Sequence, residues 1–178
     1  MKKEINVFDY AGEIMKALVT GILLTTKVED KVNSMTISWG MLGIEWSKPI
    51  FTVFVREHRF TKEQLDKNGE FTINIPYGDY DKKILGTCGS KSGRDIDKVS
   101  ELGLTLVESN IVSVPAIKEL PLTLECKIIY KQAQDPHEMT PENRDTFHPQ
   151  NVDGSFPMAN RDYHTAFYGE IVSAYIVE

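Results

Sequence analysis

The stretch NSMTISWG, from Asn33 to Gly40, decides how this chain folds, and two later runs belong with it. One is REHRFT, from Arg56 to Thr61, and the other is GSKSGRDIDK, from Gly89 to Lys98. None of the three runs identifies a fold alone, so their order and spacing along the chain matter as much as their residues.

As a β-strand, the first run has two unlike faces, because successive side chains of a strand point to opposite sides. The faces are Ser34, Thr36 and Ser38 on one side, and Asn33, Met35, Ile37 and Trp39 on the other. The small hydroxyl face would let a flat ring approach the backbone, where N–H groups and hydroxyls meet its heteroatoms. An outward polar strand face explains the same pattern, and the pattern alone favours that simpler interpretation.

The REHRFT run indicates the start of a helix, because Thr61 and Gln64 have the spacing of a capping box. A helix N-terminus offers unpaired N–H groups and a positive dipole end, which attract anions. Arg56 and Arg59 come just before it, and an arginine fork matches phosphate oxygens in pairs. The alternative is a well-capped helix with arginines on the surface.

The third run interleaves glycines with Ser90, Lys91 and Ser92. Glycines permit the positive φ and close backbone approach that phosphate-binding loops require. The run is neither a Walker A loop nor a GxGxxG motif, and a turn before a helix is the commoner explanation of such a run.

The composition is that of one soluble globular domain spanning 1–178. The 178 residues are 41% hydrophobic and 26% charged, which is enough to bury a core. The formal net charge of -6 argues against a nucleic-acid or anionic-membrane partner. Cys88 and Cys126 lack CxxC spacing, which favours a reducing compartment. Because the longest apolar run, near Ala17–Leu24, is too short for a spanning helix, we expect a cytoplasmic protein.

Hydrophobic alternation and turn signals predict mainly β structure, which favours a closed β-barrel with helical decorations. The expected strands are 20–28, 33–41, 50–55, 70–75, 104–108, 122–130 and 166–177, and the expected helices are 10–18, one from Thr61, 79–87 and 95–102. The segment at about 132–163 is rich in Pro, Asp, Asn and His and is interpreted as a long polar loop insertion. Such a loop is either solvated or placed at a site or subunit contact.

The three runs, in this order and spacing, resemble the flavin reductase-like family, the flavoredoxin type of FMN-binding split barrel. LPLTLECKI, from Leu120 to Ile128, and YHTAFYGEIV, from Tyr163 to Val172, also resemble the closing strands of that barrel. The resemblance covers the chain from about Val19 to the C-terminus and departs at the insertion. It implies a mainly β fold with short helices, a split β-barrel of Greek-key type, and a bound FMN.

The resemblance also implies which residues hold the FMN. The first run would line the flavin ring, and the second and third would lie at the ribityl-phosphate end. The residues carried over are Ser34, Met35, Thr36, Ile37, Ser38, Arg56, Arg59, Thr61, Ser90, Ser92 and Lys98. His164 is the one side chain nominated near the exposed ring face, although a structural histidine is the better interpretation.

A flavin performs the redox chemistry itself, while its protein selects the donor and the acceptor. The resemblance therefore implies an FMN-dependent oxidoreductase that takes electrons from a reduced nicotinamide or a protein donor and passes them to a small acceptor. It also implies a homodimer with each flavin near the subunit boundary. The alternatives are a flavin-binding electron carrier without its own small-molecule substrate, and a β-barrel interaction module that has lost the cofactor site.

Other kinds of catalytic site have little support in the sequence. There is no G-x-S-x-G elbow, and the spacings of His137, His148 and His164 match no zinc or di-iron motif, so no metal is expected. Cys88 beside Lys91 suggests a lowered thiol pKa, but a small buried residue is the simpler interpretation.

Overall fold

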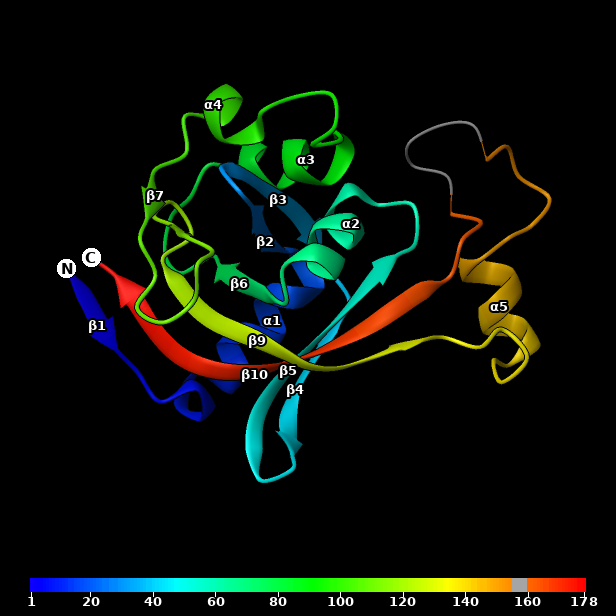
Figure 1. Ribbon diagram of the computed structural model, residues 1–178, viewed down its shortest axis with the longest axis horizontal. Helices are drawn as coiled ribbons and strands as arrows, with labels where there is room; N and C mark the ends of the chain where they lie inside the picture. Colours follow the sequence, from blue (N-terminus) through cyan, green and yellow to red (C-terminus); the bar gives the residue numbers. More distant parts are fainter. Residues whose placement is uncertain (155–159) are drawn as a thin grey trace.

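Strands dominate the computed structural model, which describes residues 1–154 and 160–178 (Figure 1). The strands are β1 (Lys2–Glu4), β2 (Ile22–Val28), β3 (Lys31–Ile37), β4 (Gly40–Glu45), β5 (Lys48–Arg56), β6 (Glu70–Ile75), β7 (Leu106–Val107), β8 (Ala116–Ile117), β9 (Leu122–Ala133) and β10 (His164–Val177). The helices are the 3-10 helix η1 (Val7–Tyr10), α1 (Ala11–Thr20), α2 (Phe60–Lys67), α3 (Lys83–Ser90), α4 (Lys98–Leu102) and α5 (Pro141–Phe147). The prediction of a mainly β chain with short helices is confirmed.

The large antiparallel sheet has the order β3-β2-β6-β9-β10-β5-β4, and β1 pairs with β10. β3 and β4 follow each other in the chain but stand at opposite ends of this order. Within the described residues no ladder joins them, so the expectation of a closed barrel is wrong and the barrel is split. The split lies at Ser38 and Trp39, where the chain crosses from one edge strand to the other.

The alternation of β2 explains how the barrel is covered. Ile22 and Leu24 face the main core, whereas Leu23 belongs to a second cluster with Leu85 of α3 and Leu120. α3 and α4 therefore lie over the outer face of β2 and β3, as Figure 1 shows at the top of the molecule. This cover decides which side of β3 stays open.

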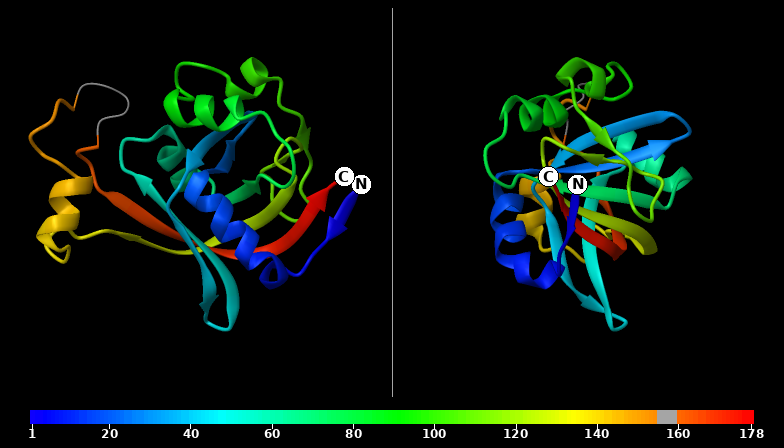
Figure 2. Two further views of the ribbon diagram at one scale, coloured as in Figure 1. Left: turned by 180° about the vertical axis from the view of Figure 1, so that it is seen from behind. Right: turned by 90° about the vertical axis from the view of Figure 1, so that its left-hand side faces the viewer.

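α1 lies across the other side of the sheet (Figure 2). Its buried side chains, Ile14 and Leu18, are four residues apart, so they share one face of the helix and pack into the main core. At ten residues α1 is the longest helix of the described chain, and no helix there has the length and apolarity needed to cross a membrane.

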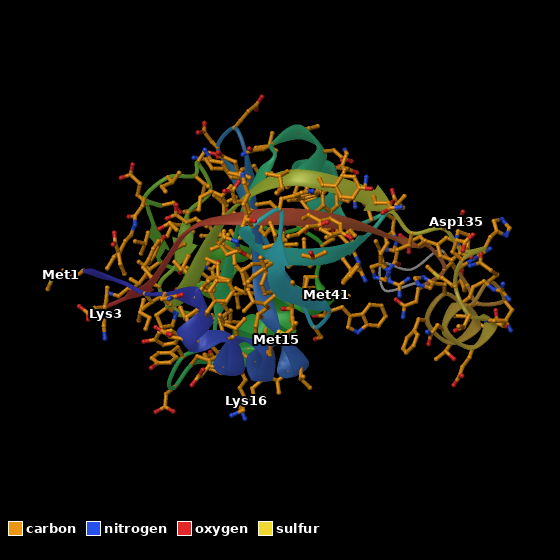
Figure 3. The ribbon with its side chains drawn as sticks, turned by 90° about the horizontal axis from the view of Figure 1, so that it is seen from below. Met1, Lys3, Met15, Lys16, Met41 and Asp135 are labelled. Atoms are coloured by element: carbon orange, nitrogen blue, oxygen red, sulfur yellow. The ribbon has the colours of Figure 1, made fainter. Side chains whose placement is uncertain are left out.

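β9 and β10 extend beyond the barrel and carry the segment between them, here called the arm (134–154 and 160–163 as described). Figure 3 shows Asp135 in the arm, well to the side of the strands that carry Met41. The arm contains α5, so the expectation of a loop throughout 132–163 is wrong. Thr140 caps this helix through a hydrogen bond from the Asn143 N–H, and Pro141 occupies its first turn.

Candidate functional site

Two adjoining cavities open beside the split of the barrel. The basic cavity, of about 690 Å³, lies between β3, the start of α2, the α3–α4 connection and the arm. Its lining residues are Asn33, Met35, 58–61, 88–95, Lys98, Gly154, Arg161 and Asp162. Five of these are lysine or arginine (Arg59, Lys91, Arg94, Lys98 and Arg161) and two are aspartate (Asp95 and Asp162). A local excess of positive charge in a chain of net charge -6 favours a small anion.

The second cavity, here called the aromatic cavity, has a volume of about 410 Å³. It is lined by 35–39, Phe54, Arg56, Arg59, Gly89, Asn160 and His164. Met35, Arg59 and Gly89 line both cavities, so the two form one cleft along β3. One end of this cleft is cationic, and the other has apolar and aromatic walls.

Lys98 is the most deeply buried cation of the basic cavity, at 4% exposed. Its Nζ donates to the carbonyls of Ser34 (2.9 Å) and Cys88 (3.0 Å), so its third N–H has no acceptor among the described residues. Burial lowers the pKa of Lys98, and burial likewise lowers the pKa of Arg59. Both charges are therefore poorly solvated, and an anion in the cavity would stabilise them.

Thr61 faces the basic cavity from the first turn of α2, but it does not cap the helix. The N-cap residue is Arg59, without a side-chain cap bond, so the predicted capping box is wrong. Gln64 instead donates to the carbonyl of Lys31 and accepts from the hydroxyl of Thr26 (2.5 Å). The Thr61 hydroxyl accepts from Asn33 Nδ2 (3.0 Å), which leaves its own proton available to an acceptor in the cavity.

Ser90 and Ser92, both predicted from the third run, line the basic cavity. Each hydroxyl is already hydrogen-bonded to a backbone group nearby in the sequence. Ser90 Oγ donates to the carbonyl of Gly86 (2.8 Å), and Ser92 Oγ accepts from the Arg94 N–H (3.2 Å). Gly93 is needed for close approach, because a Cβ there would lie 2.1 Å from Asn33 Oδ1. The loop is thus packed directly onto β3.

The hydroxyl face of β3 is only partly open. Ser34 is fully buried and shares a hydrogen bond with Thr25 (2.8 Å), so its side chain points into the protein, away from the cleft. Thr36 lines the aromatic cavity but donates to the carbonyl of Leu85 (2.7 Å) under α3. Ser38 is exposed at the split and lines the same cavity. Met35 and Ile37, assigned to the opposite face, also line it.

Arg56 lies in a different place from the one predicted. It lines the aromatic cavity and not the basic one, and its side chain is largely buried. Its guanidinium donates to the carbonyls of Phe147 (2.9 Å) and Asp162 (2.5 Å). Arg56 therefore holds the arm, which explains why it does not accompany Arg59 into the basic cavity.

His164 lies in the wall of the aromatic cavity, 5.1 Å from the ring of Trp39 between centroids. Burial, assisted by the positive charge of Arg56, lowers the pKa of His164 to about 3, so the imidazole is neutral. Its Nδ1 is buried and has no hydrogen-bond partner among the described residues. Cys88, in contrast, has its thiol pKa raised to about 11 by burial, which makes a reactive thiolate unfavourable.

Three residues of the cleft were not predicted as site residues. Trp39 belongs to the first run but was assigned to the face of the strand opposite the hydroxyl groups, and Arg161 and its neighbour Asp162 lie in the predicted loop. The aromatic character of Trp39 next to the strand end was a usable signal. Nothing in the local sequence of Arg161 distinguishes it from a solvated arginine. Among the described residues no group of His, Cys, Asp and Glu has the arrangement of a metal site.

Known proteins share this sequence pattern and this barrel. Residues 15–178 match the family described as flavin reductase like domain. An uncharacterized protein of Archaeoglobus fulgidus is 32% identical over 141 residues, covering 78% of this chain and 75% of that protein. The chain spans about half the length of two further curated relatives, which it matches over 51% and 55% of their lengths.

Solved structures are similar over most of the chain. Flavoredoxin of Desulfovibrio vulgaris has a TM-score of 0.65 at 24% identity, covering 89% of this chain and 69% of that one. Flavoredoxin from Methanosarcina acetivorans has a TM-score of 0.63 at 28% identity, covering 89% and 68%. These likenesses confirm the predicted barrel fold.

Proposed function

This chain belongs to the flavin reductase-like family, and from that premise we propose that it is an FMN-binding oxidoreductase. The family supports a flavin cofactor and a flavin-related redox function. We propose FMN as the flavin, a reduced nicotinamide or a redox protein as the electron donor, and a small molecule as the acceptor.

The observation that carries this proposal is the cleft formed by the two cavities. FMN has a flat ring at one end and a phosphate monoester at the other, which suits an aromatic cavity joined to a basic one. Arg59 and Lys98 would hold the phosphate through charge. The Thr61 hydroxyl and the third N–H of Lys98 would also donate to it, because neither has an acceptor among the described residues. A charge-assisted hydrogen bond of this kind is about twice as strong as a neutral one.

At the other end, Ser38 and the backbone of β3 would meet the polar edge of the ring. The bound flavin supplies the redox chemistry, and the residues of the chain orient it and limit the access of water. His164 stays neutral, and Trp39 covers part of the cavity wall. The charged residues of this cavity are Arg56, which is hydrogen-bonded to the arm, and Arg59, which also lines the basic cavity. The aromatic and apolar part of the wall suits a flat ring.

Nicotinamide oxidation separates this function from its main alternative. The purified chain loaded with FMN is mixed with NADH or NADPH, and absorbance is followed with free flavin or oxygen as acceptor. Turnover supports the oxidoreductase. A chain that holds FMN but oxidises neither nicotinamide takes its electrons from a redox protein or is an electron carrier, and the similarity to two flavoredoxins favours the carrier.

We also propose that the protein is a homodimer. The apolar segments 50–55 and 71–75 do not support this, because Phe51 and Phe71 lie fully buried in the chain's own core. Support comes instead from the β4–β5 hairpin, where Met41, Ile44 and Trp46 are 60%, 71% and 56% exposed. β4 is also an edge strand of the sheet, which leaves its outer backbone groups open to a partner.

A further inference from the structure

The arm is fixed to the barrel by one buried arginine. The Arg56 guanidinium, at the end of β5, donates to the carbonyls of Phe147 (2.9 Å), Asn160 (3.1 Å) and Asp162 (2.5 Å), and its NH1 lies 3.1 Å from His148 Nδ1. Three carbonyls from two parts of the arm thus converge on one cation. A planar fork with several fixed donors can join them, whereas a lysine ammonium cannot reach all of them at once.

Further contacts fix the part of the arm that returns to β10. The Asp162 carboxylate accepts from the His58 N–H (2.9 Å) and pairs with His58 Nδ1 (2.5 Å), so the arm is tied to the start of α2. The amide of Gln150 donates to the carbonyl of Arg161 (2.8 Å). Residues 160–162 are therefore held by their backbone on both sides.

This fixed backbone delivers the side chain of Arg161 to the basic cavity. Arg161 lines that cavity together with Arg59 and Lys98, which come from other elements. Gly154 packs against it, because a Cβ at Gly154 would lie 3.0 Å from Arg161 Cδ and 3.2 Å from its NH1. Among the described residues no carboxylate forms an ion pair with Arg161, so its charge is available to a ligand.

We propose that Arg161 is a further ligand of the cofactor's phosphate monoester, and that Arg56 is the positioning residue that places it there. The inference rests on the proposed FMN function and adds a contact from the arm. The phosphate is then held from three sides: by α2, by the α3–α4 connection and by the arm. The arm thereby contributes to the preference for a phosphorylated flavin.

The test compares FMN with riboflavin, which has the same ring and no phosphate. Dissociation constants are measured by flavin fluorescence for the full chain, for Arg161→Ala, and for Arg144→Ala as the matched control. Arg144 is also an arginine of the arm, but it pairs with Asp145 on α5 and lines neither cavity. We expect Arg161→Ala to weaken FMN about tenfold or more and to leave riboflavin unchanged. Arg144→Ala should change neither constant.

Arg56→Lys tests the positioning role while keeping the positive charge. It should weaken FMN more than riboflavin, because Arg56 also lines the aromatic cavity that would hold the ring of both flavins. The double variant Arg56→Lys/Arg161→Ala should bind FMN no more weakly than the weaker of the two single variants. Equal losses for both flavins, no loss in Arg161→Ala, or additive losses in the double variant would overturn the inference while leaving the proposed function intact. A wild-type chain that takes up neither flavin would overturn both.

Discussion

At the scale of single residues, His164 gives the chain a pH-dependent stability. Its folded pKa of about 3 lies below the unfolded value of about 6.5, so only the unfolded state gains a proton as the pH falls between them. The contribution of neutral His164 to the free energy of unfolding is therefore lost as the pH falls from about 6.5 towards about 3. The expected slope is up to about 1.4 kcal/mol per pH unit from this group.

Urea unfolding at about pH 7, 6 and 5 measures this slope. His164→Asn removes the titrating group, so its free energy of unfolding should depend less steeply on pH than that of the wild type over this range. The same slope in both proteins would mean that His164 is protonated in the folded state or that its pKa is near normal.

Residue positions were predicted in part where a run fixes the spacing, as for Thr61 and Lys98, which line the basic cavity although the predicted capping box is wrong. They were not predicted where the helix or segment that covers the residue comes from a distant part of the sequence. Alternation correctly separates Ser34 from Met35, but α3, about fifty residues later, decides which face is covered. Arg56 differs from Arg59 for a similar reason, because one ends a strand beside the arm and the other begins a helix.

At the scale of elements, Glu125 of β9 holds the connection between β7 and β8 to the sheet. Its fully buried carboxylate accepts from the N–H groups of Asn110 (2.6 Å), Ile111 (2.7 Å) and Val112 (3.2 Å). Glu125→Ala leaves these donors without their acceptor, which should cost about 3 kcal/mol and lower the Tm by roughly 6–12 °C.

Glu119→Ala is the matched control in the same thermal unfolding experiment. Its carboxylate also accepts a backbone N–H, that of Thr105, but the side chain is partly exposed, so water can replace the lost bond. We expect a loss of about 1 kcal/mol or less. Equal Tm shifts for the two variants would show that the Glu125 contacts are no more important than a surface bond.

The strands of the barrel were largely predictable, since their hydrophobic alternation is strong; β6 has the predicted bounds, 70–75. α5 was missed although Thr140 and Pro141 are good start signals, because the helix buries none of its residues and has no apolar stripe. The full length of β9 was also missed, because its outer end is exposed and lacks the alternation that burial imposes. β10 begins at His164, two residues earlier than predicted.

At the scale of the whole molecule, the proposed dimer should depend on the β4–β5 hairpin. Light scattering at low micromolar concentration should give the mass of two chains for the wild type and of one chain for Ile44→Asp, because a charge there enters an interface expected to bury at least about 2,000 Å². Val19→Asp, at an equally exposed apolar position on α1, should remain a dimer. A monomeric wild type with FMN fully bound would contradict the dimer.

The central claim is that FMN lies in the cleft along β3, and a titration with FMN followed by visible absorption tests it most directly. The wild type and the control variant Val19→Trp should each bind one FMN per chain. Ser38→Trp, which fills the aromatic cavity from an exposed position, should stay folded and bind none. Failure of the wild type to take up FMN, or unchanged affinity in Ser38→Trp, would contradict the account.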